Sequence, residues 1–367
     1  MDVVIVNCFD TYEHRVDLLY EVLTQEGYTV EVLTSDFRHF EKVIRSDNKN
    51  NYKFFHAKQY KKNLSYSRLS SHVKLSKDIF NYLEKRTTPD LLWVLLPPNS
   101  FAKEAAKYKK NHKEIKLVFD LIDLWPETMP VGSIKNFFPF SIWKNLRDNN
   151  LQYANFVVTE CNLFQDKLNE VLKGINTKTL YLARPLEQYT PRLNLPNDRF
   201  CLCYLGSINN IIDIDEIVTI IKELKKQRKV ELHIVGDGER KDELISSVEK
   251  VGSTVIFHGR VYDTENKQKI FDSCHFGLNI MKKTVCVGLT MKSMDYFEYG
   301  LPPINNIKGD TWENIERFNM GINFDGNISN LSEYDYQLRL NARRFFEDYL
   351  TINVFKKNVF EIINNLK

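Results

Sequence analysis

The sequence predicts an α/β protein built from two doubly wound domains. Its 367 residues exceed the ~100–200 residues of one ordinary domain. Near-continuous apolar runs of strand length alternate with helical patterns, which indicates parallel sheets with helices on both faces. The alternation stops at a polar, proline-bearing stretch, ARPLEQYTPRLNLPNDR (183–199), and then begins again. This stretch therefore separates two domains of the same class.

The first half is predicted to alternate strands with helices. A helix over Asp17–Gln25, closed by Gly27, follows the first strand, and AKEAAKYKKNHK forms an amphipathic helix between the third and fourth strands. The predicted strands are VVIVN (3–7), TVEVLT (29–34), LLWVLLP (91–97), KLVFDLID (116–123) and NFVVTE (155–160).

The second half repeats the pattern. We expect domains at 1–185 and 186–345, and a C-terminal helix at 346–367 that crosses back to the first domain. The predicted strands are FCLCYLG (200–206), VELHIVGDGE (230–239), TVIFHG (254–259) and FGLNIM (276–281). The predicted helices are Asp215–Lys225, Lys241–Lys250, Glu265–Asp272 and a last group over about 335–366.

Charge and hydropathy exclude several classes of protein. The net charge is +3, so the chain lacks the global positive field of a dedicated nucleic-acid binder. Asp2 stands where a signal peptide would carry positive charge. No window approaches the ~20 apolar residues that span a bilayer. We therefore expect a cytoplasmic protein, or one that lies peripherally on the inner face of the cell membrane.

The six cysteines are expected to be free thiols. They form no C-x-x-C pair, and no histidines cluster with them in the sequence, so we expect no metal site. Cys201 and Cys203 alternate along a predicted strand and face the same side. Buried free thiols fit a reducing compartment.

A short helix in GLTMKSMDYFEYGLPPINN (288–306) carries a cation and an anion three residues apart. If Thr290 caps this helix, its N-terminus forms an anion site to which Lys292 adds a full charge. Asp295 lies on the same side of the helix. Lys292 is thus a candidate for the phosphates of a nucleotide and Asp295 for its ribose hydroxyls. The alternative is an ordinary surface ion pair on a capped helix.

Several stretches together resemble one enzyme family. The string K-S-M-D-Y-F-E-Y-G-L-P-P-I (292–304) resembles the donor-binding motif of bacterial family 4 glycosyltransferases. In the family's order, FCLCYLGSINN (200–210), VELHIVGDGERKDEL (230–244) and TVIFHGRV (254–261) resemble other landmarks of its nucleotide-binding domain. FDLIDLWPETMP (119–130) resembles a segment of the subgroup that builds surface polysaccharides.

The resemblance implies the GT-B fold, in which two Rossmann-like domains face each other across a cleft and the C-terminal one holds a nucleotide sugar. It also implies retention at the anomeric carbon and no metal or other cofactor. Where the family carries a first glutamate this chain has Val287, so backbone groups of Gly288 and Leu289 are expected to meet the donor sugar. Where many members carry an arginine and a lysine on the diphosphate, it has Ser207 and Ile212. Lys292 is then the main cation on the phosphates and a catalytic candidate.

Further donor-binding candidates lie in the loops after the strands of the second domain. Gly206 and Ser207 follow its first strand, and Gly236 allows a ligand to approach the backbone closely. A plain strand-to-helix turn is the alternative for Gly236. Tyr262 stands where related enzymes hold the nucleobase, and packing is its alternative.

Acceptor-side candidates come from the first domain. Asp123 follows a strand and precedes a Trp-Pro turn, which fits acceptor binding or general base work on an acceptor hydroxyl, although a helix cap is the alternative. Glu127 and Arg15 are also expected to face the acceptor. The string DID (213–215) resembles a metal-binding D-x-D, but it opens a helix and we interpret it as structural.

The segment SIKNFFPFSIWKNLR (133–147) combines aromatic residues with flanking cations. Such a composition suits the lipid–water interface, where lipid-linked acceptors are found. A buried helical hairpin is the alternative.

The sequence therefore predicts a glycosyltransferase that moves a hexose-type sugar from a nucleoside diphosphate, with UDP favoured, to a growing, lipid-linked capsular or extracellular polysaccharide. One alternative is a catalytically silent GT-B subunit that stabilises a partner enzyme. The departures at Val287 and Ser207 would explain this, as would Ile122, which stands before Asp123 where many relatives carry a histidine. Another is a GT-B-like nucleotide-sugar epimerase or hydrolase. The oligomeric state stays open.

Overall fold

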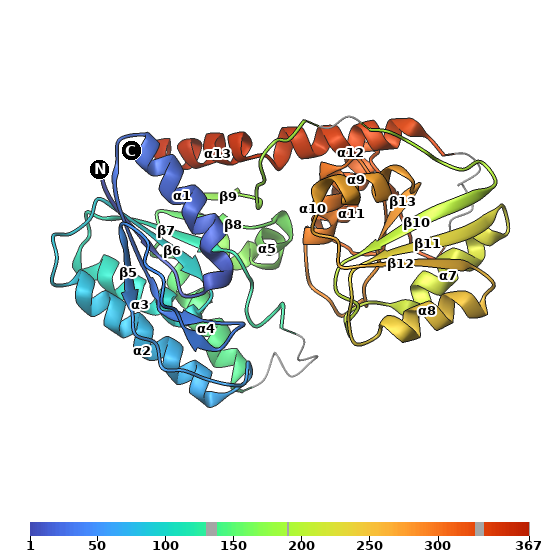
Figure 1. Cartoon of the computed structure of the whole chain (residues 1–367). Coiled ribbons are helices and arrows are strands. Elements are labelled where there is room, and N and C mark those ends of the chain that lie inside the picture. Colours follow the sequence, from blue (N-terminus) through green and yellow to red (C-terminus); the bar gives the residue numbers. More distant parts are fainter. Residues whose placement is uncertain (130–137, 189–190, 327–333, 367) are drawn as a thin grey trace. The chain divides into compact units, whose positions relative to one another are not determined.

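The computed structural model describes residues 1–129, 138–188, 191–326 and 334–366 (Figure 1). They fall into two compact units, unit 1 with Met1–Ala183 and Ile352–Lys367, and unit 2 with Arg184–Thr351. The sequence predicts the second domain border between residues 345 and 346, whereas unit 2 ends at Thr351. The border lies further along because α12 (Tyr336–Tyr349) packs on α10 (Met291–Glu298) inside unit 2, where the ring centres of Phe345 and Phe297 are 5.2 Å apart.

Unit 1 contains a seven-stranded parallel sheet in the order β5-β2-β1-β6-β7-β8-β9. Its register pairs Val3 of β1 with Val30 of β2 and Leu91 of β6. The strands are β1 (Asp2–Val6), β2 (Thr29–Ser35), β5 (Tyr52–Phe55), β6 (Leu91–Leu96), β7 (Lys116–Leu121), β8 (Phe156–Thr159) and β9 (Thr177–Thr179), and a separate antiparallel pair is formed by β3 (Phe37–Arg38) and β4 (Val43–Ile44).

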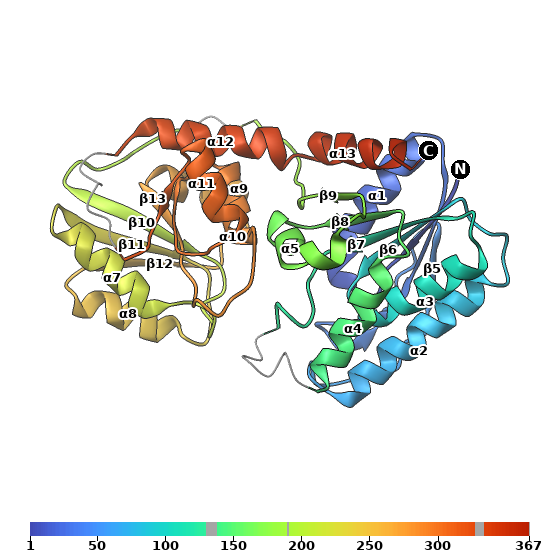
Figure 2. The same cartoon turned by 180° about the vertical axis from the view of Figure 1, so that it is seen from behind.

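Helices cover both faces of this sheet, as Figures 1 and 2 show. Residues of α1 and α13 bury one face with Val3 and Ile5, and residues of α2 and α3 bury the other with Val4 and Val6. The alternation along β1 therefore feeds two cores, as expected for a parallel strand. The helices are η1 (Asp10–Tyr12), α1 (Glu13–Gln25), α2 (Tyr66–Leu83), α3 (Asn99–Asn111), α4 (Phe140–Leu151), α5 (Asn162–Lys167), α6 (Asn169–Leu172) and α13 (Ile352–Asn364).

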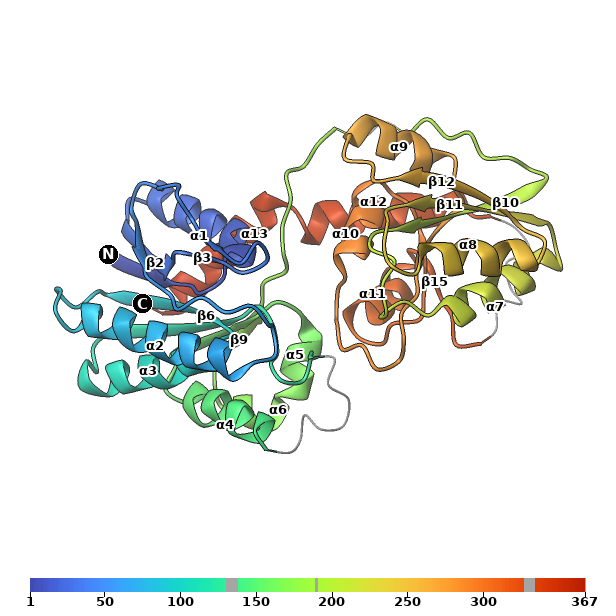
Figure 3. The same ribbon diagram turned by 60° about the horizontal axis from the view of Figure 1, so that its bottom comes forward.

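Unit 2 contains a six-stranded parallel sheet in the order β12-β11-β10-β13-β14-β15. Figure 3 shows α7 and α8 on one side of β10–β12 and α9 on the other. The strands are β10 (Arg199–Leu205), β11 (Lys229–Val235), β12 (Thr254–Gly259), β13 (Phe276–Asn279), β14 (Pro303–Asn305) and β15 (Ile322–Asn323). The helices besides α10 and α12 are α7 (Ile214–Lys225), α8 (Lys241–Lys250), α9 (Thr264–Asp272) and α11 (Asp310–Phe318).

The topology confirms the two Rossmann-like α/β domains that the sequence predicts. In each unit the strand order reverses beside the first strand, between β1 and β6 in unit 1 and between β10 and β13 in unit 2. Such switch points open a crevice at the carboxyl ends of the strands, where ligands of doubly wound sheets bind. Within the described residues, no helix combines the length and the apolar character needed to cross a membrane.

Candidate active site

The loop after β13 leads into α10 at the switch point of unit 2. Thr290 caps this helix as predicted, because its Oγ1 accepts a hydrogen bond from the Ser293 backbone N–H at 2.9 Å. Asn279, the last residue of β13, fixes the cap: its Oδ1 accepts from Thr290 Oγ1 at 3.0 Å and its Nδ2 donates to Ser293 Oγ at 2.9 Å. The positive end of the helix dipole is thus tied to the end of the strand.

Lys292 lies in the first turn of α10 and is buried, with 8% of its surface exposed. Its Nζ lies 4.0 Å from the centre of the Tyr204 ring and has no hydrogen-bond partner in the described part of the chain. Burial lowers the pKa of its ammonium from 10.5 to about 7. A buried amine without a partner is costly, so an anion that enters here would supply the missing interaction.

Two glycines bring the neighbouring loops together. Gly236 has φ +142°, and a Cβ on it would lie 2.0 Å from the Gly206 carbonyl oxygen. A Cβ on Gly206 would lie 3.8 Å from Cε of Lys292, so this loop runs directly beside the lysine. The close approach that the sequence assigned to Gly236 is therefore made to another backbone segment.

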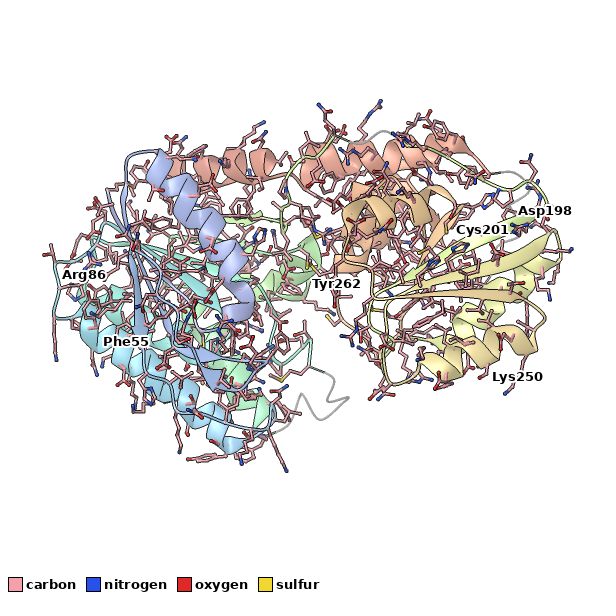
Figure 4. All side chains as sticks on the ribbon, in the orientation of Figure 1. Phe55, Arg86, Asp198, Cys201, Lys250 and Tyr262 are labelled. Atoms are coloured by element: carbon pink, nitrogen blue, oxygen red, sulfur yellow. The ribbon has the colours of Figure 1, made fainter. Side chains whose placement is uncertain are left out.

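A pocket of about 260 Å³ opens at the carboxyl ends of β10–β12. Tyr262 stands at it with 82% of its surface exposed, which leaves its ring free to meet a ligand. Figure 4 shows Tyr262 at the opposite end of these strands from Cys201 and Asp198. The pocket is lined by Leu205, Gly206, Ser207, Val235, Gly236, Asp237, Arg260, Val261 and Tyr262.

Asp295 does not pair with Lys292. Its Oδ1 lies 2.8 Å from Lys267 Nζ and 3.2 Å from Arg184 Nη1, and Arg184 Nη2 donates to its Oδ2 at 3.2 Å. Arg184 also pairs with Glu298 at 2.6 Å. The simple surface ion pair within α10 is therefore absent from the described chain, and Asp295 is held by cations from α9 and from the start of unit 2. One lone pair of Oδ2 is left for a ligand.

The remaining donor-side candidates form the loop before α10 and the loop after β10. The Gly288 carbonyl accepts hydrogen bonds from Thr311 N and Oγ1 at 2.9 and 2.8 Å, and Leu289 is buried. Ser207 is exposed, and its carbonyl accepts from the Tyr204 hydroxyl at 2.9 Å. Asp213 caps α7, in agreement with the structural interpretation of DID.

In unit 1, Asp123 lies two residues beyond β7 and closes the turn that follows. Its Oδ1 accepts from Leu124 N at 2.8 Å and from Thr128 Oγ1 at 2.5 Å, and its Oδ2 accepts from Trp125 Nε1 at 2.7 Å. Burial raises the pKa of this carboxyl group although these hydrogen bonds act in the opposite direction. Asp123 is thus a structural acceptor within this turn, and its Oδ2 accepts only one of the three hydrogen bonds.

The two other acceptor candidates are engaged inside unit 1. Arg15 is buried and forms a bidentate pair with Asp120, with Nε–Oδ2 and Nη2–Oδ1 distances of 2.9 and 2.7 Å, and its Nη1 donates to the Leu180 carbonyl. Glu127 forms a bidentate pair with buried Arg147 at 2.8 Å. Arg15 therefore differs from the expectation that it faces an acceptor, because every nitrogen of its guanidinium has a partner in the core.

Sequence reasoning missed Arg68, which lies on α2 beside the Asp123 turn. Only 5% of it is exposed, and its guanidinium lies 4.4 Å from the ring of Trp125. Its Nη1 donates to the Asn63 carbonyl at 2.8 Å, while its Nε has no hydrogen-bond partner in the described chain. Nothing in the sequence signals Arg68, because α2 is a polar helix far from Asp123 along the chain.

Arg68 also differs from the other fully buried arginines. Arg15, Arg147 and Arg339 each pair with a carboxylate, whereas Arg68 pairs with none among the described residues. Burial lowers the pKa of its guanidinium. The nearby His72 is buried with neither ring nitrogen bonded in the described chain, and burial lowers its pKa well below 6.5. The Asp123 region thus holds a buried cation that forms no ion pair with a carboxylate among the described residues, although its charge acts to lower the pKa of Asp123.

The predicted interfacial segment 133–147 is described from residue 138 onward, and 133–137 lie outside the described residues. Phe138 and Ile142 are 79% and 53% exposed, whereas Arg147 is buried. A groove of about 440 Å³ runs between α3 and α4. It is lined by Lys103, Lys107, Lys110, Ile142, Asn145, Leu146, Asn149 and Asn150.

Comparison with known proteins agrees with this geometry. Residues 199–325 match the family model described as "Glycosyl transferases group 1". No curated protein matches the chain in sequence. The match covers unit 2 from β10 to the end of β15, which includes the pocket and α10, and it supports a glycosyltransferase.

Three solved structures illustrate the likeness in fold. Sucrose-phosphate synthase from Thermosynechococcus elongatus has a TM-score of 0.70 at 14% identity, covering 100% of this chain and 99% of its own. The lipopolysaccharide outer core galactosyltransferase WaaB, in its apo form, has 0.67 at 15% identity, with 99% of each chain covered. HepE from Anabaena, in complex with UDP, has 0.67 at 13% identity, covering 99% of this chain and 100% of its own. These likenesses confirm the GT-B fold.

Proposed function

We propose that this GT-B glycosyltransferase transfers a hexose-type sugar from a UDP-sugar to a growing, lipid-linked capsular or extracellular polysaccharide. One observation carries the donor half of the proposal: Lys292 is a buried amine beside Gly206 at the switch point of unit 2, and its Nζ has no hydrogen-bond partner among the residues that the structure describes. That HepE was solved with UDP and with UDP-glucose supports UDP as the nucleotide here. Asp295 lies three residues after Lys292 and takes the second acidic position of the donor motif. It is therefore the group that would bind the ribose.

The donor would bind with its diphosphate against the start of α10. Lys292 is then protonated and pairs with the phosphate oxygens, while the dipole of α10 adds to the attraction. Asp295 accepts from a ribose hydroxyl, Tyr262 packs on the base, and backbone groups of Gly288 and Leu289 meet the sugar. Charge that builds on the leaving diphosphate is stabilised by groups that are already in place, so no metal is needed for this step.

The acceptor would bind to unit 1. Asp123 Oδ2 takes the proton of the acceptor hydroxyl as the new bond from that oxygen to the anomeric carbon forms. The bond from the anomeric carbon to the diphosphate breaks, and UDP leaves with the electron pair. We propose that the acceptor oxygen approaches the anomeric carbon from the same face that the diphosphate leaves, which retains the anomeric configuration. Arg68 would supply the counter-charge for the diphosphate of a lipid carrier. The exposed lysines of α3, together with exposed Ile142 and Phe138, support a contact of the protein with the inner face of the membrane.

Calorimetric titration of the full chain without metal tests the donor site. UDP should bind more tightly than GDP, and Lys292→Met should weaken UDP binding by more than tenfold. Lys250→Met is the matched control, because Lys250 is exposed at the end of α8 (Figure 4). If the wild-type chain binds neither nucleotide, the proposal fails in favour of a silent subunit. Labelled UDP-glucose can also be offered together with an acceptor from a lipid extract. If it is epimerised or hydrolysed and no label reaches the acceptor, the result would instead favour an epimerase or a hydrolase.

A further inference from the structure

Metal-ligating side chains gather on one face of the unit 2 sheet, from the amino-terminal half of β10 to the middle of β11. Cys201 lies on β10, and Glu231 and His233 lie on β11, where the register places Cys201 beside Glu231. Their ligand atoms all lie within 4.8 Å of one another. Glu231 Oε1 is 3.6 Å from Cys201 Sγ and 3.2 Å from His233 Nε2. None of the three belongs to the pocket or to α10.

These separations fit one small cation. A tetrahedral zinc ion places sulfur and oxygen ligands about 3.5 Å apart, and nitrogen and oxygen ligands about 3.3 Å apart, given its usual bond lengths. The observed 3.6 and 3.2 Å agree with both values. Thiolate, imidazole and carboxylate together favour zinc over magnesium or calcium, which prefer sites made of oxygen alone. We propose that Cys201, Glu231 and His233 bind a divalent cation of the zinc type, with water in the fourth position.

His258 on β12 orients the histidine of this site. Its Nε2 lies 3.0 Å from His233 Nδ1, and the two rings are stacked with an angle of 17° between their planes. With Nδ1 of His233 donating to His258, Nε2 of His233 carries the lone pair that faces Glu231 and Cys201. Ligating histidines are commonly fixed by such a partner on the other ring nitrogen.

One cation competes for the site. Arg199 Nε lies 3.5 Å from Glu231 Oε1, and the side chain of Arg199 is 39% exposed. It can therefore move into solvent when a metal ion takes the carboxylate. Arg199 should lower the affinity of this site for the metal ion. Its positive charge repels the ion, and its movement into solvent breaks the ion pair with Glu231.

The cation would act on the structure of unit 2. Cys201 lies on β10, five residues before Gly206, which directly follows this strand; the separation is about 16 Å at the usual rise per residue of β-strands. Figure 4 shows it beside Asp198 and away from Tyr262. The ion would join β10 to β11 at the end opposite the donor pocket, so this inference is independent of the proposed function.

Titration of the metal-free full chain with Co²⁺ tests the inference. The wild-type protein should develop a thiolate-to-cobalt charge-transfer band, and Zn²⁺ should abolish it with one equivalent. Cys201→Ser should lose the band and bind Zn²⁺ at least tenfold more weakly, and His233→Gln should also weaken binding at least tenfold. Cys286→Ser is the control, because it removes the one described cysteine that is not buried and should leave the titration unchanged.

A wild-type protein without the band, or Cys201→Ser with wild-type zinc affinity, would overturn the inference. Circular dichroism establishes whether each variant is folded. If Cys201→Ser does not fold, Arg199→Gln decides, because it leaves the three ligands in place and removes the competing charge. Tighter zinc binding by Arg199→Gln supports the site, and unchanged or weaker binding rejects it.

Discussion

The Lys292 ammonium group lies 4.0 Å from the centre of the Tyr204 ring, and this ring face is its principal polar contact in the described chain. A cation over an aromatic ring is stabilised, but by less than the hydration it has lost. The pKa of about 7 expresses this imbalance. Lys292 is therefore maintained at a cost in stability, which is typical of a residue retained for binding or catalysis.

Lys292→Met should stabilise the unliganded protein. Methionine fills a similar volume without a buried amine, so the free energy of unfolding should rise by about 1–3 kcal/mol. Chemical denaturation followed by circular dichroism measures this change. The same variant should lose UDP-glucose binding, and a loss of binding that came with a loss of stability would mean that Lys292 serves the fold instead. Lys250→Met should change neither quantity by more than about 0.5 kcal/mol.

Binding of UDP-glucose should weaken as the pH rises through about 7. Below this pH, Lys292 of the free protein is already protonated, and above it the diphosphate must recruit a proton, because it raises the pKa of the lysine it contacts. Affinity should fall by up to about tenfold per pH unit in that range. UDP-glucose is the suitable ligand since, unlike UDP, it has no phosphate that titrates near neutrality.

The unliganded protein should show the opposite trend. Between pH 7 and pH 10.5 the unfolded chain holds the Lys292 proton and the folded chain does not, so this residue makes the free energy of unfolding rise with pH.

Calorimetry in buffers of different ionisation enthalpy measures the proton that the protein takes up when it binds UDP-glucose. An uptake of zero at pH 8 in the wild-type protein would contradict a direct contact between Lys292 and the diphosphate.

Gly236→Ala should distort the donor pocket. Its Cβ would overlap the Gly206 carbonyl, and the residue would keep a φ of +142° that side chains rarely adopt. We expect a loss of at least about 2 kcal/mol in the free energy of unfolding and a UDP affinity lowered more than tenfold. Gly174→Ala separates backbone strain from steric overlap, because Gly174 also has a positive φ, +79°, but nothing lies within 4 Å of an added Cβ. It should lose stability to strain alone and keep UDP binding.

These contrasts show which parts of the protein its sequence predicts. Strands such as β1, β6, β7 and β10 are apolar runs bounded by glycine or polar residues, so their places and the cap at Thr290 follow from local patterns. The strands β5, β9, β14 and β15 have only two to four residues, and α2 carries polar residues on most of its surface, so no local pattern predicts them. Which partners Asp295 and Lys292 find depends on Arg184, Lys267 and Tyr204, which are distant along the chain. The surroundings of Arg68 likewise depend on residues that are distant along the chain, so the sequence does not predict them.

Arg68→Gln should weaken the binding of an isoprenoid diphosphate. Farnesyl diphosphate is a soluble probe for the carrier, and it should bind the wild-type chain at least tenfold more tightly than the variant, because the guanidinium is then paired. UDP binding should not change. Arg86→Gln is the control, since Arg86 already pairs with Asp2 and Glu31 at 2.5 and 2.7 Å. If inorganic pyrophosphate binds as well as farnesyl diphosphate, the cluster recognises an anion without its lipid, and equal binding by the variant would exclude Arg68.

The three lysines that line the α3–α4 groove should govern adsorption to anionic membranes. Lys103, Lys107 and Lys110 are exposed on one face of α3, beside exposed Ile142. Each lysine near an anionic surface contributes about 1 kcal/mol, so replacing all three by glutamine should lower the partition coefficient at least about a hundredfold.

Co-sedimentation with vesicles of phosphatidylglycerol and phosphatidylcholine measures this partition. Vesicles of phosphatidylcholine alone should bind neither protein. A control variant that carries glutamine at Lys58, Lys77 and Lys85 has the same net charge, and these lysines are exposed elsewhere on unit 1. Equal loss in both triple variants would mean that overall charge drives adsorption, and the groove would then have no special part in it. A loss confined to the α3 variant, and larger at low salt than at high salt, would place the membrane contact at α3 and α4, because screening acts on the lysines and leaves the apolar contact of Ile142 unchanged.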